Sequence, residues 1–266
     1  MTPLRLDAAD IEAIENATLG AVVAEREETL LDDAGTAWRL PIDPGTVGRA
    51  RSAVPLDHAR APHDADALID AVERRYRAHG QPPRWRLAEV PALDGLRRAL
   101  AARGYRAEQP TLTQVGRLAD LRDAFRPPPG QAPVAVRIDT APDAGWAQAF
   151  LGAGADAADA GHRLRVLGRS HGNRYASASL AGHTAAVGII ALAPRWAGLH
   201  GLRTEPAWRQ RGLAGRLLHA LAEAGLQAGL DRVFLQVEED NASALSLYRR
   251  AGLRTAWRYR YWRGLD

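Results

Sequence analysis

The chain has 266 residues, enough for one large domain or for two domains of about 130 residues each. Its composition is 46% hydrophobic and 25% charged, which excludes a disordered, collagen-like or low-complexity chain. All 35 basic residues are arginine, the formal net charge is +4, and the absence of cysteine excludes disulfides, thiolate nucleophiles and cysteine-based zinc sites.

The chain begins with MTPLRLDAAD, which contains acids and no apolar leader segment, and no stretch approaches 18 uninterrupted apolar residues. These features predict a cytoplasmic protein that does not enter a membrane. In the first half, periodicity predicts a helix over 66–79 and a short strand over 84–88. A second helix over 93–103, ended by Gly104, and a strand region over 105–118 follow.

A proline-rich segment, residues 126–133, divides the chain nearly in half, because it cannot continue a helix or a central strand. Residues 1–125 contain 17 Arg and 20 acids (net −3), whereas residues 126–266 contain 18 Arg and 11 acids (net +7). We therefore predict a domain over 1–125, a linker over 126–133 and a domain over 134–266. The basic second domain is expected to hold an anionic ligand.

The second half reads as a mixed α/β sequence. One or two helices are predicted over 141–167, and strands over 174–180, 185–192 and 196–204. A helix over 215–227, a strand over 233–237, a helix over 242–251 ended by Gly252 and a strand over 253–263 complete the chain.

The two halves are weakly repeated. The segment LRRALAARGY, residues 96–105, aligns with ALSLYRRAGL, residues 244–253, at an offset of 148 that superposes Gly104 on Gly252. This similarity indicates an internal duplication.

The segment from Thr204 to Leu218, TEPAWRQRGLAGRLL, reads as a strand end, a tight turn and a helix start. Small residues in the turn let the backbone approach a ligand, and free amides at a helix start bind anions. The arginines at 209, 211 and 216 could add contacts to phosphate. The segment matches neither a Walker loop nor the dinucleotide-binding glycine pattern.

A second motif, NASALSLYRRAGL, residues 241–253, follows the next strand; Asn241 can cap its helix, and Tyr248 lies two turns further on. Together, R-x-x-G-x-A and N-x-x-A-x-x-L-Y-x-x-x-G resemble the GNAT N-acetyltransferase superfamily in type, order and spacing. The resemblance covers residues 134–266, and the first half resembles a degenerate GNAT repeat. It implies an α/β fold of two GNAT-like domains, each a mostly antiparallel, splayed sheet flanked by helices.

The resemblance also implies acetyl transfer from acetyl-CoA to a primary amine in a ternary complex, with no metal. Tyr248 would protonate the departing thiolate, and Asn241 would contact the pantetheine arm or a bound water. The remaining residues implied to bind the cofactor are Leu202, Arg203 and Thr204 along the pantetheine, and Arg209, Gln210, Arg211, Gly212, Leu213, Ala214, Gly215 and Arg216 around the pyrophosphate.

The resemblance does not identify the general base, because this chain has Gln236 at the position where some family members carry a Glu. Glu238 is the first candidate, since it ends the strand beside the expected thioester; Glu239, Asp240 and Glu205 also lie near the strand ends, although a solvated surface acid is the simpler interpretation of each. His200 is a second, although a satisfied histidine within a strand is the more common outcome. The first half has Leu93 and Leu100 at the positions of the motif Asn and Tyr, which predicts that it binds no CoA.

Two other functions remain open from sequence. One is a catalytically silent acyl-CoA sensor. The other is a nucleic-acid-binding module, suggested by the alternating aromatic and arginine residues of 257–263, although the same alternation fits a packed sheet face better. A small molecule is favoured over a protein as the acceptor, and no nucleic-acid partner is expected. The identity of the acceptor and the oligomeric state are not determined.

Overall fold

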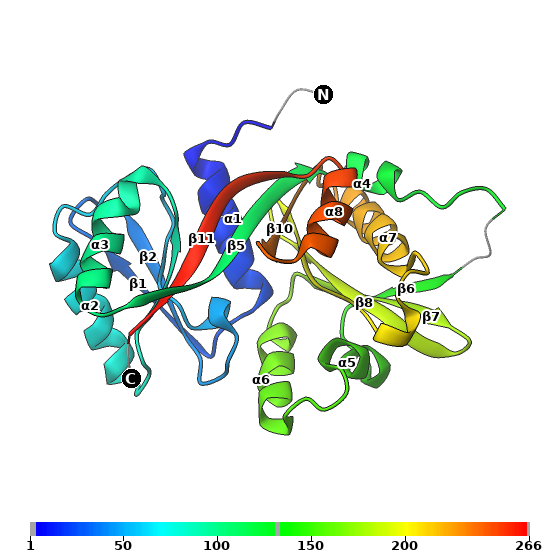
Figure 1. The fold of residues 1–266 in the computed structure, drawn as a ribbon, viewed down its shortest axis with the longest axis horizontal. Coiled ribbons are helices and arrows are strands. Elements are labelled where there is room, and N and C mark those ends of the chain that lie inside the picture. The colour runs from blue at the N-terminus through cyan, green and yellow to red at the C-terminus, as the bar shows by residue number, and fades with distance from the viewer. Residues whose placement is uncertain (1–3, 131–133, 265–266) are drawn as a thin grey trace.

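The computed structural model describes residues 4–130 and 134–264 and contains two lobes joined by long central strands (Figure 1). The last three residues of the predicted 126–133 linker therefore lie outside the described residues. The first half contains α1 (Ala8–Ala21), β1 (Arg26–Leu31), β2 (Ala37–Ile42), β3 (Val54–Pro55), α2 (Ala65–Ala78), β4 (Arg84–Ala88), α3 (Asp94–Ala102), β5 (Arg106–Arg117) and α4 (Leu118–Ala124).

The second half contains β6 (Ala135–Asp139), α5 (Ala144–Leu151), α6 (Ala157–Gly168), β7 (Asn173–Leu180), β8 (His183–Leu192), β9 (Ala197–Thr204), α7 (Leu213–Gln227), β10 (Arg232–Glu238), α8 (Ala242–Arg250) and β11 (Arg254–Arg263). From α6 to β11, the second half repeats the order of elements from α1 to β5, whereas β6, α5 and α4 have no counterpart.

The offset of 148 residues, first seen in one short sequence segment, also separates the starts of equivalent helices and strands in the two halves. The first residues of α2 and α7 differ by 213 − 65 = 148, and those of β4 and β10 by 232 − 84 = 148. The starts of α3 and α8 (242 − 94) and of β5 and β11 (254 − 106) give the same difference. The duplication therefore extends over the helices and strands that form each lobe.

The two halves exchange strands in the centre of the molecule. The larger sheet has the order β4-β11-β5-β10-β9-β8-β7-β6, so β11 of the second half lies between β4 and β5 of the first half. In turn, β5 lies between β11 and β10 of the second half, and both of its pairings are antiparallel. Figure 1 shows β5 and β11 running together from one lobe to the other. Each half thus completes its sheet with a strand of the other half.

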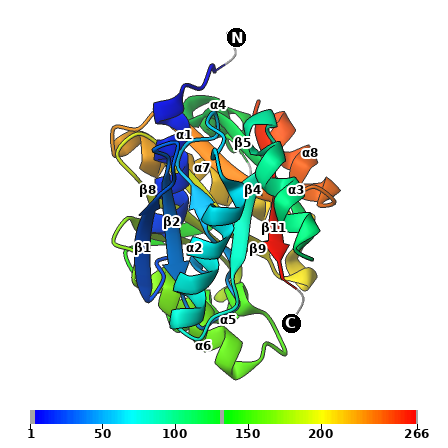
Figure 2. The same cartoon turned by 90° about the vertical axis from the view of Figure 1, so that its left-hand side faces the viewer.

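Helices cover the sheets of both lobes. In the first lobe, α2 and α3 pack on the sheet seen in Figure 2, with Trp38, Trp85 and Tyr76 fully buried between them. In the second lobe, α7 and α8 bury Leu217, Leu221 and Tyr248 against the sheet. Helix α4 of the first half also contributes to this core through Leu118 and Leu121. The segment preceding the proline-rich stretch is therefore packed on the second half.

The strands and helices predicted from residue 66 onward are present with small shifts at their ends. Helix α7 begins at Leu213 rather than at 215, and α4 and β6 were not predicted. The elements before residue 65, from α1 to β3, were not predicted. Within the described ranges, 4–130 and 134–264, no helix is both long and apolar enough to span a membrane.

Candidate active site

The strands β9 and β10 pair at one end and diverge at the other. They are parallel and pair only from Ala197 to Leu199 on β9 and from Val233 to Leu235 on β10. Beyond this point, the register of β9 against β8 shifts between Val187 and Ile189, and Gly201 adopts a positive φ of 58°. A bulge of this kind redirects the backbone of β9, and the divergence leaves an opening between two neighbouring strands.

The opening leads to the N-terminus of α7. Gly212, the N-cap residue, has a left-handed φ of 76°, and no side chain caps the helix there. Gln210 also has a positive φ, 61°. The first amides of α7 therefore have no side-chain acceptor at the cap position, and the positive end of the helix dipole faces the opening. This geometry favours an anionic ligand.

Helix α8 forms the other side of the opening. The Asn241 side chain accepts a hydrogen bond from the Ala244 amide at 3.1 Å and so caps α8. Two turns later, the Tyr248 side chain is only 8% exposed, and its burial raises the pKa of Tyr248 to about 12. A tyrosine with this pKa stays protonated at neutral pH and can serve as a proton donor.

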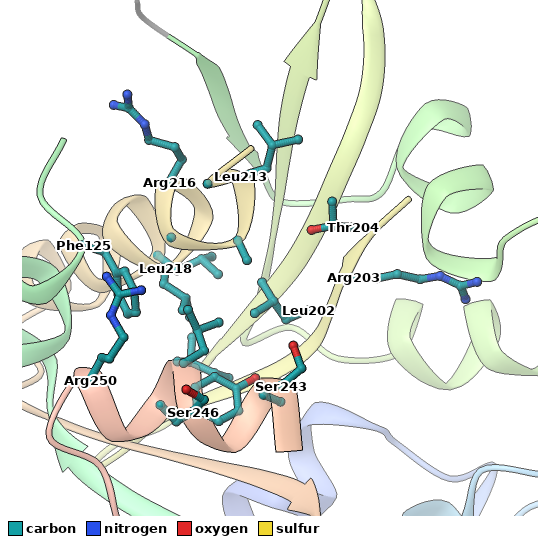
Figure 3. Close-up of a pocket in the computed structure, with 18 of the residues that line it drawn as sticks. Phe125, Leu202, Arg203, Thr204, Leu213, Arg216, Leu218, Ser243, Ser246 and Arg250 are labelled. Atoms are coloured by element: carbon teal, nitrogen blue, oxygen red, sulfur yellow. The ribbon is translucent and has the colours of Figure 1, made fainter. Parts of the chain in front are cut away.

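These elements enclose a groove of about 1210 Å³ (Figure 3). Most of the residues predicted to bind the cofactor or to catalyse line it, namely Leu202, Arg203, Thr204, Arg209, Gln210, Gly212, Leu213, Ala214, Gly215, Arg216, Glu238, Asn241 and Tyr248. The structure thus brings together residues from β9, the following turn, α7, β10 and α8. Their roles in binding and catalysis stay predictions.

Two predicted arginines have side chains engaged elsewhere. Arg203 points away from the groove in Figure 3, and its guanidinium donates to the carbonyls of Phe150 and Leu151 at 2.9 and 3.0 Å. Arg211 does not line the groove; its guanidinium lies over the Trp208 ring, 5.0 Å from the centroid. The guanidinium groups of Arg203 and Arg211 are therefore engaged with Phe150, Leu151 and Trp208 rather than with the groove.

The groove also contains residues that the motifs did not single out. Arg250 of α8 lies over the Phe125 ring, 5.5 Å from the centroid, and both residues line the groove together with Arg126, Ser243 and Ser246. Arg250 lies within the motif of residues 241–253 and could have been included. Phe125 and Arg126 carry no sequence signal, because only the packing of α4 on α7 brings them to the groove.

Glu238 lies where the groove meets a second, smaller cavity of about 320 Å³. Its carboxylate accepts a hydrogen bond from the Gln109 amide at 2.7 Å, and its side chain is exposed. Gln236, two residues earlier, accepts a hydrogen bond from the Tyr259 hydroxyl at 3.3 Å. Among these side chains, Glu238 alone can accept a proton from an incoming amine.

His200 also lies at this junction, but its geometry does not suit a base. Arg49 donates a hydrogen bond to His200 Nδ1 at 2.8 Å, so the ring proton resides on Nε2. Burial, and then the charge of Arg49, lower the pKa of His200 well below its usual value. His200 is therefore neutral, and its Nδ1 accepts the hydrogen bond that positions the Arg49 guanidinium.

In the corresponding region of the first half, carboxylates accept hydrogen bonds from the amides at the start of α2. Position 64, which is 212 − 148, is Asp64, whose carboxylate accepts from the Ala67 amide at 2.9 Å at the start of α2. Asp33 accepts from the amides of His63 and Asp64 at 2.8 and 2.7 Å. These amide hydrogen bonds lower the pKa of Asp33 despite the opposing effect of desolvation. Two carboxylates thus already occupy the amides that Gly212 leaves open in the second half.

The alternating residues of β11 are not available to nucleic-acid bases. The aromatic side chains of Trp257, Tyr259 and Tyr261 are 7%, 3% and 6% exposed and belong to one buried cluster. The alternation therefore marks a packed sheet face, and nothing in the structure supports the nucleic-acid-binding alternative.

Comparison with solved structures places this architecture in a known fold. A GCN5-related N-acetyltransferase from Kribbella flavida superposes with a TM-score of 0.69 at 16% identity, covering 96% of each chain. A functionally unknown conserved protein from Staphylococcus epidermidis gives 0.66 at 11% identity, covering 96% of this chain and 100% of the other. A tandem GNAT protein from the clavulanic acid biosynthesis pathway gives 0.62 at 18% identity, covering 97% and 96%. The chain therefore has the mixed α/β fold of GNAT N-acetyltransferases, as predicted, and one of these similar structures is a tandem GNAT protein.

A family model defines the relationship more closely. The model described as "Probable histone acetyltransferase Rv0428c C-terminal" matches residues 8–262, and the chain belongs to this family. The match includes both halves, which agrees with strands shared between them. No curated protein matches the chain.

Proposed function

We propose that this acyltransferase transfers an acetyl group from acetyl-CoA to the primary amine of a small-molecule acceptor. The observation that carries the proposal is the groove between β9 and β10, which ends at the uncapped N-terminus of α7 and contains Tyr248. An elongated thioester with a pyrophosphate at one end matches a groove with free amides at one end and a proton donor beside the strand opening.

In this proposal, the extended backbone of Leu202–Thr204 binds the pantetheine arm, which also contacts Asn241 or a water held by it. The amides between Gln210 and Gly215 bind the pyrophosphate, and Arg209 and Arg216 add positive charge beside it. Arg250, over Phe125, extends the cationic lining on the opposite wall of the groove. No metal is needed for this chemistry.

The reaction is a direct transfer. Glu238, itself or through a water, takes a proton from the ammonium of the acceptor, and the free amine nitrogen attacks the thioester carbonyl carbon. The new C–N bond forms, the C–S bond breaks, and Tyr248 donates its proton to the departing thiolate. The acylated nitrogen releases its remaining surplus proton, directly or through water, to the Tyr248 phenolate, which restores the acid. Proton transfer by a positioned group contributes about 10²–10⁴ in rate.

We also propose that the chain is organised as a domain over 1–125 that does not bind CoA, a linker over 126–133, and a catalytic domain over 134–266. The carboxylates of Asp33 and Asp64 support the first part of this proposal, because they take the place of a phosphate at α2. The exchanged strands make the two domains one structural unit.

A pair of substitutions at Gly212 tests the phosphate site. Gly212→Asp and Gly212→Asn are nearly isosteric, both tolerate the left-handed backbone, and a Cβ at this position has no atom within 4 Å. Gly212→Asp introduces the residue type that the first half has at the equivalent position, Asp64. We expect calorimetric titration to show that Gly212→Asp binds acetyl-CoA about tenfold or more weakly than Gly212→Asn, because its charge opposes the pyrophosphate. Equal affinities would exclude the phosphate site.

A further inference from the structure

The smaller cavity, of about 320 Å³, adjoins the groove and is built by both halves. It shares Ile189, His200, Gly201, Gln236 and Glu238 with the groove, so the two spaces meet beside the proposed thioester position. From there it extends into the first half, where Arg49, Arg84 and Thr111 line it. A molecule in this cavity would have one end at Glu238, within reach of the transferred acetyl group.

The charges of this cavity are predominantly positive. Three arginines line it, Arg49, Arg84 and Arg163, whereas Glu238 is its single acid among the described residues. Although the first half carries a net charge of −3, the charged side chains that it contributes to the cavity are both arginines, Arg49 and Arg84. The acidic residues of the first half lie elsewhere on its surface and in its core.

Two of these arginines have no carboxylate partner within the described residues. Arg163 pairs with Asp159 at 2.7 Å, but Arg49 donates to the neutral ring of His200, and no ion pair involves Arg84. The Nε of Arg84 is buried and has no hydrogen-bond acceptor. Buried guanidinium N–H groups usually have a hydrogen-bond acceptor, and a bound anion would supply the acceptor that the Nε of Arg84 lacks.

A fourth arginine, Arg51, lies outside the cavity lining and adds to the positive potential near Arg84. Burial, and then the charge of Arg84, lower the pKa of Arg51, although the charge of Asp43 opposes this shift. Its guanidinium donates to the Gly45 carbonyl at 2.8 Å, a neutral acceptor. Like charges gathered in a partly buried site are unfavourable by themselves, and an anion bound among them removes that cost.

Arg84 and Glu238 lie on strands three positions apart in the sheet. Strand β4 is separated from β10 by β11 and β5, which at the usual strand spacing places the two strands about 14 Å apart. The pairings of Glu238 with Thr111, of Thr111 with Tyr259 and of Tyr259 with Ala88 place Arg84 four residues further along β4. Both side chains line the same cavity, so it presents opposite charges at well-separated positions. A small molecule with an ammonium at one end and an anion at the other complements this arrangement.

We propose that the acceptor is a small amine that also carries an anionic group, a carboxylate or a phosphate, held by Arg84 and Arg49 while its amine faces Glu238. This inference rests on the acetyl transfer proposed above and specifies the class of its acceptor. A lysine-rich protein tail, such as a histone segment, has the wrong charge for this cavity.

Thiol release from acetyl-CoA tests the proposal with matched pairs of acceptors. L-Amino acids and dipeptides are compared with their C-terminal amides, and phosphoethanolamine with ethanolamine, to distinguish carboxylate from phosphate recognition. We expect at least one anionic acceptor to exceed its neutral partner about tenfold or more in kcat/KM. In Arg84→Gln and Arg49→Gln, this preference should disappear while turnover of the neutral amine remains.

Arg98→Gln, an equivalent change at an exposed position of α3 outside the cavity, should leave the preference unchanged. Equal kcat/KM for all pairs, or faster turnover of a lysine-rich peptide than of any anionic amine, would overturn the proposal. If no amine releases thiol, acetyl transfer itself is contradicted. Calorimetry with N-acetyl-L-alanine and its amide then tests the anion site alone, since only the carboxylate should bind, and Arg84→Gln should abolish that binding.

Discussion

Tyr248 illustrates how a single side chain gains its chemistry from burial. Its ring belongs to the core under α8, and the resulting desolvation raises the pKa of Tyr248 to about 12. A raised pKa keeps the phenol protonated throughout the range in which enzymes work, so the proposed acid needs no activating partner. The sequence motif identified the residue, but its burial is a property of the packed helix.

The pH dependence of the rate tests this role. The acid is active below its pKa and is lost as the pH rises through about 12, so kcat should not fall between pH 8 and the ordinary tyrosine pKa of about 10. Tyr248→Phe should lower kcat about 10²–10⁴-fold with little change in KM. An alkaline limb below pH 10 that is present in the wild type and absent in Tyr248→Phe would contradict the assignment.

A buried ion pair stabilises the first half near the proposed acceptor cavity. Arg86 of β4 and Glu15 of α1 are each 1% exposed and form a short ion pair, and Arg86 lies 5.3 Å from the ring centroid of Tyr259, which lines the cavity. Burial alone would raise the pKa of Glu15, but Arg86 and His58 together hold it below the usual value.

Glu15→Gln should therefore lower the free energy of unfolding by about 3–5 kcal/mol, because it leaves the Arg86 charge buried without a counter-charge. Because the folded-state pKa is lowered, the pair contributes above the unfolded pKa of 4.5 and is lost as the pH falls through the folded value. Urea unfolding at pH 7 and pH 3 measures both effects. Glu12→Gln, at an exposed position of the same helix, should change stability by less than about 0.5 kcal/mol.

At the scale of elements, the starts of α2 and α7 occupy equivalent positions but differ in what satisfies their amides. Asp33 and Asp64 cap α2, whereas Gly212 leaves α7 open. A carboxylate at a helix N-terminus satisfies the same donors as a phosphate and repels it. One duplicated element has thus become a structural cap and the other a candidate binding site.

This difference predicts that the protein binds one acetyl-CoA per chain. Calorimetric titration should give a stoichiometry of one, and Gly212→Asp should weaken that single event. A second binding event that survives Gly212→Asp would show that the first half also binds the cofactor, and the capped-helix argument would then be wrong.

At the scale of the whole molecule, the exchange of β5 and β11 makes each half depend on the other. Without residues 1–125, the second half lacks β5, and its strands β10 and β11 lose their common neighbour. Helix α4 would also be missing from the core beneath α7. Unpaired central strands and an uncovered core favour aggregation over folding.

We expect residues 134–266 expressed alone to be insoluble, or to unfold without a cooperative transition. Co-expression of 1–133 with 134–266 should restore a soluble complex that binds acetyl-CoA, because both exchanged strands are then available. Circular dichroism on heating and gel filtration measure the two outcomes. A cooperatively folded, monomeric 134–266 fragment would show that the strand exchange is dispensable.

The sequence by itself determined the fold family and most of the elements after residue 65, with the exception of α4 and β6. Most of the residues that its motifs singled out line the groove. These features depend on local signals, because periodicity, glycine positions and short motifs act within one turn or one strand. The repeat at an offset of 148 was visible in ten residues and proved to relate whole lobes.

Only the tertiary structure decided which half supplies which strand and what lines the acceptor cavity. Strand exchange depends on pairing between residues more than a hundred positions apart, as for Gln114 and Thr255, and leaves no local pattern. Arg49 and Arg84 had no sequence signal either, since the net charge of a domain does not tell which side chains face a cavity. The class of enzyme is thus fixed by motifs, whereas the chemistry of the proposed acceptor site arises from contacts between distant segments.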